Sequence, residues 1–503
     1  MSWQPNPLEE QRLEKAGRLR AEGIDPYPLR VERTHTTAEA SAEFERAAEG
    51  DEVRVTVCGR VVAVRDMGKT IFGHIADEHG RLQLFLRRDD LGEEPHAVLK
   101  KLVDLGDFVQ ASGEMFRTKS GETSLHVRQW RMLSKAISPL PFAKEQEVDG
   151  RIVRYSAFAD VEERYRQRYA DLAVNPEVRD IFRKRARLIS ALRRFMDNNG
   201  FLETETPVLQ PLYGGAAARP FTTYHNQLKQ QLFLRISFEL YLKRLLVGGY
   251  ERVYEIGRDF RNEGVSFKHN PEFTQLEFYA AYWDYHDVMD FTERMVAYAA
   301  EAVLGTTKIV FQDDTIQLAA PWHRISLRDA IKQFAEIDYM DYLDSSSLAK
   351  AIKGIGGEAP PDTPWGKLID GLLGDFVEPR LIQPTFITDY PRDISPLAKG
   401  VPGDPLHVER FEFFIGGMEM GNAFTELNDP VEQRKRFEAL QDLFSQDDEE
   451  RNPIDEDYLR AMRYGMPPNG GFGMGVDRLA MLFTNSRTLR EVLLFPHLRE
   501  KED

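Results

Sequence analysis

Residues 251–263 read Glu-Arg-Val-Tyr-Glu-Ile-Gly-Arg-Asp-Phe-Arg-Asn-Glu, an alternating stretch that ends in charged side chains. A polar loop follows, and residues 268–277 (Lys-His-Asn-Pro-Glu-Phe-Thr-Gln-Leu-Glu) lead into a second apolar run. This pattern predicts two strands, over 250–261 and 274–282, that form a hairpin. The guanidinium group of Arg261, at the mouth of this hairpin, has the planar shape that matches phosphate oxygens. We therefore expect a phosphate-binding site at this point of the chain.

Two further stretches have unusual patterns. Residues 200–207 read Gly-Phe-Leu-Glu-Thr-Glu-Thr-Pro and follow a long helix expected over 179–199. Residues 470–479 read Gly-Gly-Phe-Gly-Met-Gly-Val-Asp-Arg-Leu and place Arg478 at the start of another helix. Glycines let a ligand approach the backbone, and a helix N-terminus favours anions, so the second stretch is typical of a phosphate site. A turn packed through its glycines is the alternative interpretation.

The N-terminal part of the chain has the pattern of a small β-barrel. Between residues 53 and 133, short alternating stretches are separated by turns, and a helix-like segment over 89–105 precedes the last two strands. Five strands with one such helix are the outline of an OB-type barrel. An amphipathic helix is expected over 7–23. Its basic stripe is expected to face solvent, with a contact to RNA as the alternative; the stripe consists of Arg12, Lys15, Arg18 and Arg20.

Composition excludes several classes of protein. The chain has 503 residues, of which 42% are hydrophobic and 29% charged, so it has the length for more than one globular domain. It contains no apolar run of the roughly 18 residues that a membrane span needs, and its first residues lack the pattern of an export signal. The single cysteine, Cys58, excludes an internal disulfide framework and a Cys-rich zinc site. We expect a cytoplasmic protein that does not associate with membranes.

Charge is distributed unevenly along the chain. The net charge of −16 argues against an indiscriminate nucleic-acid binder. Residues 51–200, however, hold 27 basic and 23 acidic side chains, a balance of +4, whereas residues 301–503 hold 22 and 36, a balance of −14. A polyanionic partner is therefore better tolerated by the N-terminal part.

Taken together, the stretches 200–207, 251–277 and 470–479 resemble, in order and spacing, the three signature motifs of the class II aminoacyl-tRNA synthetases. Two other segments are similar to the lysine-specific members of the OB-fold subclass IIb: Gly-Gly-Ala-Ala-Ala-Arg-Pro-Phe at 214–221 and Gly-Asn-Ala-Phe-Thr-Glu-Leu-Asn-Asp at 421–429. The resemblance covers almost the whole chain. It implies an α+β multidomain protein with four parts: a helical extension (1–50), an OB-fold anticodon-binding domain (51–141), a connector (142–176) and a class II catalytic domain (177–503) with an antiparallel sheet flanked by helices.

The resemblance implies an ATP site built around two catalytic arginines. Arg261 would hold the α-phosphate and the carboxylate of the amino acid, and Arg478 would hold the γ-phosphate of a bent ATP. The other implied ATP-binding residues are Glu263, His269 and Phe273, with Phe273 stacked under the adenine. An ion pair between Arg261 and Glu263 at the end of a strand is the alternative without a ligand.

A magnesium site is expected at Glu412 and Glu419. Both lie among aromatic and apolar residues, where a charged carboxylate is costly unless a cation is present. Two carboxylates with no His or Cys nearby suit Mg²⁺, which prefers oxygen ligands, and the matching positions of the family hold magnesium. Solvent-facing carboxylates of a hairpin are the alternative. Glu419 and Asn422 are three residues apart, so a bulge at Gly421 is expected to bring both to one face of the strand.

An acidic pocket is expected for the amino acid. Glu239, Glu277 and Glu426 are its main carboxylates, with Glu263 as a fourth candidate. Such a pocket suits a long side chain that ends in an ammonium group and would repel aspartate. The resemblance implies these contacts to L-lysine: Glu239 to the α-ammonium, Glu277, Tyr279 and Glu426 to the ε-ammonium, Phe424 to the methylenes, and further contacts from Gly215, Arg261 and Asn422.

Three residues of the expected barrel match positions at which this subclass reads the middle uridine of the anticodon. They are Arg65, Phe72 and Gln83. An aromatic ring can stack on an unpaired base, and an amide or a guanidinium can read the base edge. An ordinary place for Phe72 in the barrel core is the alternative.

The resemblance implies a homodimeric enzyme that activates L-lysine with ATP, as lysyl-adenylate, and transfers it to the 3′ end of tRNA(Lys). A related ligase that lysylates a translation factor is one rival, but those relatives lack the barrel expected over 53–133. A synthetase-like module that only binds RNA or protein is another. The catalytic and metal-binding residue types are intact, which argues against an inactive module.

Overall fold

The computed structural model describes residues 3–48, 50–142, 144–148, 151–155, 158–443 and 453–500. They divide into two compact units, Met1–Asn175 and Pro176–Asp503, and each is described by itself. Among the described residues, no helix has the length and apolar character needed to cross a bilayer.

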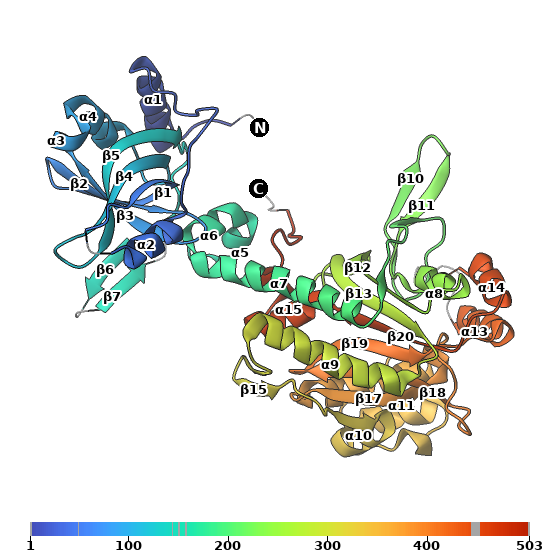
Figure 1. The fold of residues 1–503 in the computed structure, drawn as a ribbon. Helices are drawn as coiled ribbons and strands as arrows, with labels where there is room; N and C mark the ends of the chain where they lie inside the picture. The colour runs from blue at the N-terminus through green and yellow to red at the C-terminus, as the bar shows by residue number, and fades with distance from the viewer. Residues whose placement is uncertain are drawn as a thin grey trace. The chain divides into compact units, whose positions relative to one another are not determined.

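The first unit contains a closed five-stranded barrel, which confirms the predicted OB-type architecture (Figure 1). Its strands follow one another around the barrel in the order β1-β2-β3-β5-β4. Their bounds are β1 (Arg54–Asp66), β2 (Thr70–Ala76), β3 (Arg81–Arg87), β4 (Phe108–Arg117) and β5 (Thr123–Ser134). The first strand, β1, is long, and its register with β2 shifts between Val61 and Ala63. Such a bulge lets a single strand bend around the barrel.

The first unit also contains short helices. They are α1 (Pro7–Ala21), α2 (Thr37–Arg46), α3 (Arg88–Leu91), α4 (Glu93–Leu102), α5 (Val161–Arg166) and α6 (Arg168–Val174), and the unit also contains the hairpin of β6 (Lys144–Val148) and β7 (Arg151–Tyr155). The expectation that the basic stripe of α1 faces solvent is wrong for two of its members. Arg12 donates to the carbonyl oxygen of Ala136 at 2.8 Å, and Lys15 pairs with Asp104 at 2.5 Å. These contacts hold α1 against the barrel.

The second unit is built on an eight-stranded sheet in the order β16-β17-β18-β19-β20-β13-β12-β8. The strands are β8 (Leu202–Glu203), β12 (Arg252–Phe260), β13 (Glu272–Ala281), β16 (His323–Ser326), β17 (Thr385–Pro391), β18 (His407–Ile415), β19 (Met418–Thr425) and β20 (Asn469–Gly475). The predicted hairpin is confirmed as β12 and β13. The expected antiparallel sheet is also confirmed, with parallel pairs only at its two ends, between β16 and β17 and between β12 and β8.

Helices cover one face of this sheet completely and the other face only in part. The long helices α7 (Pro176–Asn198) and α9 (Tyr285–Leu304) pack side by side on the first face, together with α15 (Val476–Thr484) (Figure 1). Side chains such as Leu276 and Phe278 of β13 point into this core. On the second face, α10 (Leu327–Ala335), α11 (Ser345–Gly354) and α12 (Trp365–Leu372) cover the end near β17 and β18. This leaves the second face of β13, β19 and β20 for a site.

The remaining elements of the second unit are short. The helices are α8 (Glu239–Val247), α13 (Pro430–Leu443), α14 (Glu456–Arg463) and α16 (Leu489–Val492). The strands are β9 (Leu209–Gln210), β10 (Thr222–His225), β11 (Gln230–Leu234), β14 (Lys308–Phe311) and β15 (Asp314–Gln317). Short 3₁₀ and π segments span Tyr339–Asp341, Leu373–Val377, Glu378–Arg380 and Arg392–Ile394.

Candidate active site

Two cavities adjoin over the second face of β13, β19 and β20. We call the larger one, of about 310 Å³, the acidic cavity, because Glu239, Glu277 and Glu426 line it. The smaller one, of about 210 Å³, is the arginine cavity, lined by Arg478 among other residues. Both cavities include the same four residues in their walls, Arg261, Gln275, Asn422 and Gly473. A ligand in one cavity can therefore contact a ligand in the other at Arg261.

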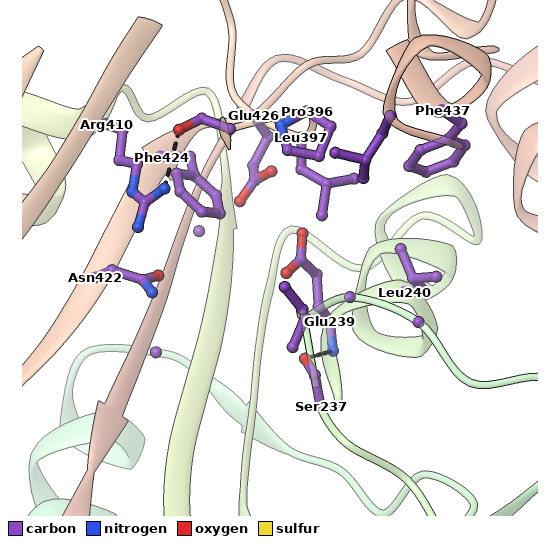
Figure 2. A pocket seen from close by; sticks show the side chains of 18 of the residues that line it. Ser237, Glu239, Leu240, Pro396, Leu397, Arg410, Asn422, Phe424, Glu426 and Phe437 are labelled. Carbon is purple, nitrogen blue, oxygen red and sulfur yellow. Dashed lines mark hydrogen bonds between the residues drawn. The ribbon is translucent and has the colours of Figure 1, made fainter. Parts of the chain in front are cut away.

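The acidic cavity brings together the residues expected to bind an amino acid. Gly215, Glu239, Arg261, Glu277, Tyr279, Asn422, Phe424 and Glu426 all line it. Figure 2 shows the carboxylates of Glu239 and Glu426 directed toward each other across the cavity. Glu277 accepts hydrogen bonds at 2.9 Å from both Ser237 and Gln275, which hold its carboxylate in place. The fourth acidic candidate, Glu263, lines only the arginine cavity.

A buried lysine that sequence analysis missed joins two of these carboxylates. The Lys243 Nζ atom donates to Glu239 Oε1 at 2.6 Å and lies 2.5 Å from Glu426 Oε2. Its side chain is fully buried. The only sequence signal is the spacing of Glu239 and Lys243, four residues apart on α8, and such a pair is usually a surface ion pair. The contact with Glu426 comes from a distant part of the chain.

The carboxylates of the acidic cavity are costly to ionise, although Arg261, Lys367 and Arg410 also line it. Burial raises the pKa of Glu426 to about 8, although Lys243 lowers it in part. Burial, then the nearby Asp259 and Glu239, raise the pKa of Glu277 well above its ordinary value. Both carboxylate oxygens of Glu426 are buried: Oε1 has no hydrogen bond to a described residue, and Oε2 has only the ion pair with Lys243. A ligand cation would satisfy these oxygens and favour the ionised carboxylates.

Two glycines make room for these acids. A Cβ atom at Gly471 would lie 2.0 Å from Glu426 Oε1 and 2.5 Å from Cε1 of Tyr279, so only glycine allows both side chains against β20. Gly215 has a φ of +88°, which favours glycine, and a Cβ there would lie 3.2 Å from the Cβ of Glu239. The glycines of these two segments therefore leave the space that the side chains of the acidic cavity occupy.

Strand β19 supplies an amide and an aromatic wall to the same cavity. Asn422 and Phe424 lie on one face of the strand, and the Arg410 guanidinium is 5.6 Å from the ring centroid of Phe424. The expected bulge is present: Phe413 of β18 pairs with Gly421, whereas Phe414 pairs with Glu419. The extra residue is therefore Met420, next to the predicted position.

The arginine cavity gathers the residues expected around ATP. Arg261, Glu263, His269, Phe273 and Arg478 all line it. The Arg261 guanidinium lies 5.1 Å from the ring centroid of Phe273, and its buried Nε has no hydrogen-bond partner among the described residues. Within that same part of the chain, no ion pair joins Arg261 to Glu263, which argues against the ligand-free alternative.

Charges in the arginine cavity are arranged for an anion. Arg478 donates to the carbonyl oxygen of Glu419 and lies 3.2 Å from Oε2 of the same residue. Burial, together with the positive charges of Arg478 and Lys268, lowers the pKa of His269, so its ring is neutral at neutral pH. A neutral imidazole can still donate one hydrogen bond to a phosphate.

Only one of the two carboxylates expected to bind magnesium lines a cavity. Glu419 lines the arginine cavity and its side chain is 36% exposed. Glu412 is buried and lines neither cavity, so the alternative of two solvent-facing carboxylates is wrong. Its carboxylate accepts hydrogen bonds from Tyr390 at 3.0 Å and from Arg410 at 2.5 Å. In the described part of the chain, no group of three or more acidic, His or Cys side chains has the arrangement of a metal site.

The charge balance around Glu412 nevertheless fits a cation. Burial raises its pKa to about 8 in spite of Arg410, and the negative charges of Glu419 and Asp370 contribute. Burial also raises the pKa of Asp370. In spite of burial, the positive charge of Arg478 lowers the pKa of Glu419, so this carboxylate is ionised beside the two carboxyl groups that are costly to ionise. A divalent cation that shared Glu412 and Glu419 would relieve the repulsion between them.

The three residues expected to read an anticodon lie on the barrel. Phe72 is half-buried on β2, between the inward-facing Ile71 and Gly73, which favours an outward platform over a core position. It lies opposite Arg65 of β1, which is exposed. Gln83 is buried and its amide is oriented from both ends, because it accepts from Ser124 at 2.8 Å and donates to Glu122 at 2.6 Å.

Sequence analysis missed an aromatic cluster beside Phe72. The ring centroids of Phe72 and Phe85 are 5.2 Å apart, and Phe85 also contacts Phe116 at 5.4 Å and His126 at 5.3 Å. Phe85 shares a strand face with Gln83, since the two are two residues apart on β3. The period-2 spacing of Gln83 and Phe85 could have indicated that Phe85 belongs to this site. The contacts of Phe85 with Phe116 and His126 could not be predicted, because these residues lie on other strands.

Comparison with known proteins agrees with this geometry. The family model described as tRNA synthetases class II (D, K and N) matches residues 160–499, and the model of the OB-fold nucleic acid binding domain matches residues 55–133.

Curated relatives are similar along the whole chain. The lysine–tRNA ligase of Roseiflexus castenholzii is 51% identical over 498 residues, and that of Chloroflexus aurantiacus is 51% identical over 499 residues; each alignment covers 99% of both chains. The lysine–tRNA ligase of Dehalococcoides mccartyi is 49% identical over 500 residues, 99% of this chain and 98% of the relative. The chain therefore belongs to the class II tRNA synthetases of the D, K and N group.

Proposed function

We propose that this chain is a lysine–tRNA ligase, which activates L-lysine with ATP as lysyl-adenylate and transfers the lysyl group to the 3′ end of tRNA(Lys). The observation that carries the proposal is the acidic cavity, whose buried carboxyl groups are costly to ionise without a bound cation, directly beside the arginine cavity at Arg261. The names of the similar proteins support the same function.

L-Lysine fits the acidic cavity by charge and by shape. Glu239 accepts the α-ammonium beside Gly215, while Glu277, Tyr279 and Glu426 surround the ε-ammonium. Phe424 packs on the methylenes, and Arg261 and Asn422 meet the carboxylate end, where the two cavities join. A side chain ending in a carboxylate would be repelled by these acids, so aspartate is excluded.

ATP occupies the arginine cavity. Phe273 stacks on the adenine, His269 and Glu263 contact the nucleotide, and Arg478 holds the γ-phosphate. Arg261 contacts both the α-phosphate and the lysine carboxylate, because it lies in the shared wall. Holding the two reacting groups together, with cations beside the developing charge, is the main source of catalysis in phosphoryl and nucleotidyl transfer.

The first step needs no general base. A carboxylate oxygen of lysine, already ionised, forms a bond to the α-phosphorus, and the bond from that phosphorus to the bridging oxygen breaks to release pyrophosphate. In the second step a ribose hydroxyl of the terminal tRNA adenosine (the 3′-OH) bonds to the lysyl carbonyl carbon. AMP leaves, and the hydroxyl proton is transferred to solvent.

Glu412 and Glu419 are the residues that would hold Mg²⁺. The raised pKa of Glu412, to which the negative charge of Glu419 contributes, supports this assignment, although Glu412 is paired with Arg410 and Tyr390. A bound Mg²⁺ supplies charge neutralisation on phosphate oxygens. Arg478, which contacts Glu419, keeps that carboxylate beside the phosphate positions.

The barrel reads the anticodon. Phe72 stacks on the middle base, while Gln83 and Arg65 contact its edge, and the outward position of Phe72 supports this role. We assign the functional parts to residues 1–50, 51–141, 142–176 and 177–503. Cytoplasmic localisation belongs to the same proposal.

The enzyme works as a homodimer that associates through the segment around Pro207 and the preceding helix α7. Large apolar side chains are exposed in this segment, which supports its burial against a second copy. They are Leu202, Val208, Leu209 and Leu212.

The test is exchange of labelled pyrophosphate into ATP, followed by charging of tRNA(Lys) transcript. We expect exchange that depends on lysine and is absent with aspartate, and charging of the transcript. Exchange with aspartate instead of lysine would overturn the proposal. Exchange without charging would favour a protein ligase, and the absence of exchange would favour a binding module.

A further inference from the structure

Lys243 is surrounded by groups of the acidic cavity but does not line the cavity itself. On its own helix, α8, it meets Glu239, and from the end of β19 it meets Glu426. The Tyr279 ring of β13 lies 5.7 Å from its Nζ, and Tyr458 of α14 also interacts with its charge. These four residues are the titratable groups that face its ammonium among the described residues.

The number of carboxylates facing the substrate, compared with the number of ammonium groups that the substrate brings, indicates the role of Lys243. Three carboxylates of the cavity, Glu239, Glu277 and Glu426, face the expected substrate, whereas a bound L-lysine brings only two ammonium groups, because its own carboxylate meets Arg261. The other charged groups of the wall have partners elsewhere: Asp455 pairs with Arg244, Arg410 pairs with Glu412, and Lys367 acts on Asp370. One buried carboxylate would therefore stay without a cation. An unmatched buried charge is strongly unfavourable, and the ammonium of Lys243 supplies the missing partner.

Lys243 also links two parts of the protein that contact opposite ends of the substrate. Glu239 begins helix α8, and Glu426 follows strand β19. One ammonium bound to both carboxylates at 2.6 Å and 2.5 Å fixes the distance between them. In the proposed function, Glu239 accepts the α-ammonium of the substrate and Glu426 accepts its ε-ammonium. A fixed distance between these two acceptors therefore suits an amino acid whose side chain has one particular length.

We propose that Lys243 is a positioning residue for amino-acid selection: its ammonium pairs with both Glu239 and Glu426 and holds the two carboxyl groups at the separation that suits lysine. This inference rests on the proposed function, since it concerns the same cavity. Burial lowers the pKa of Lys243, but Glu239 and Glu426 more than offset this, so its pKa lies above the ordinary value and the ammonium persists at physiological pH.

The experiment compares the full-length wild type with Lys243→Met in lysine-dependent pyrophosphate exchange. Kinetics are measured for lysine, for ornithine, which is one methylene shorter, and for ATP, over a range of pH. Lys135→Met is the matched control, because Lys135 is equally buried and pairs with Asp104 at 2.5 Å and Asp107 at 2.8 Å, but in the barrel unit.

In Lys243→Met, we expect the KM for lysine to rise by about tenfold or more, while the KM for ATP stays within about twofold. The preference for lysine over ornithine should fall. The rising limb of kcat/KM for lysine should move to higher pH, because removing a cation raises the pKa of nearby carboxyl groups. The titration of free lysine is the same for the wild type and the variant, so it does not contribute to this shift. Lys135→Met should change none of these quantities.

Two results would overturn the inference: an unchanged KM and unchanged preference for lysine, or equal increases in KM for lysine and ATP, which indicate a merely structural role. Lys243→Arg should restore part of the lysine preference and the pH profile, because it keeps the charge. If Lys243→Met does not fold, Lys243→Gln, which keeps a donor without the charge, is tested instead. A wild type without lysine-dependent exchange would refute the proposed function, independently of Lys243.

Discussion

Glu426 combines complete burial, an Oε1 atom without a hydrogen bond to a described residue and a raised pKa, so it is the residue from which amino-acid recognition is best tested. In Glu426→Gln the amide keeps the shape but loses the charge that attracts an ammonium. We expect a rise in KM for lysine of about tenfold to a hundredfold, from the roughly 1.5–3 kcal/mol of a charged hydrogen bond.

The measurement is pyrophosphate exchange at varied lysine and at varied ATP. The KM for ATP should not change, because Glu426 lies outside the arginine cavity. Glu432→Gln, on the surface of α13, is the control and should behave as wild type. An unchanged response to lysine would remove Glu426 from the ε-ammonium site.

The raised pKa of Glu426, about 8 against an ordinary value of 4.5, predicts a pH dependence of stability. The folded protein keeps a proton that the unfolded chain has lost, so the ligand-free protein loses stability as pH rises from about 5 to 8. Lysine binds the ionised carboxylate and offsets this loss. The increase in Tm caused by lysine should therefore be larger at pH 8 than at pH 6. Equal increases at both values would contradict this, and Glu426→Gln should weaken the dependence.

Gly471 sets the room available beside Glu426. In Gly471→Ala the new methyl group would lie 2.0 Å from Glu426 Oε1 and must displace it or Tyr279. We expect lysine activation to fall by at least about tenfold, the size of effect that small misplacements at an active site produce, while ATP still binds. Gly371→Ala on α12, where no atom lies within 4 Å of the new Cβ, is the matched control. Wild-type activation by Gly471→Ala would show that this contact is not limiting.

At the scale of elements, regular alternation along the chain predicted the barrel strands and one hairpin of the large sheet. The hairpin of β12 and β13 and the five barrel strands follow from period-2 patterns, and the bulge beside Gly421 follows from the spacing of Glu419 and Asn422. Contacts between distant segments could not be predicted in this way. From the sequence, Lys243 would be expected to form a surface ion pair with Glu239, whereas its contact with Glu426 comes from a distant segment. The contact of Glu412 with Tyr390 likewise depends on a neighbouring strand, and Arg410 adds a second hydrogen bond.

The strands β1, β2 and β3 present the aromatic platform that we assign to the anticodon. In Phe72→Leu the apolar bulk stays, but the flat ring that stacks on a base is lost. Stacking is worth about 1–3 kcal/mol per base, so the KM for tRNA(Lys) in charging should rise about fivefold to a hundredfold. Pyrophosphate exchange, which needs no tRNA, should not change. Equal charging by the variant and the wild type would remove Phe72 from the anticodon site.

At the scale of the whole molecule, the division of charge separates the two activities. The chain has a net charge of −16, whereas residues 51–200 carry a balance of +4. Binding of a polyanion weakens steeply with salt, because counterions are released from its phosphates. Raising salt from about 50 mM to 200 mM should therefore reduce tRNA charging far more than lysine-dependent exchange. Equal sensitivity of both reactions would argue against an electrostatic contribution to tRNA binding.

The common wall of Arg261, Gln275, Asn422 and Gly473 has a practical consequence for redesign. A variant library aimed at a non-natural substrate has freedom only where a position belongs to one compartment alone, such as Phe424 or Glu426. Substitutions in the shared wall itself would alter ATP binding at the same time. A redesign of amino-acid specificity should therefore place its substitutions deep in the acidic cavity and keep the shared wall unchanged.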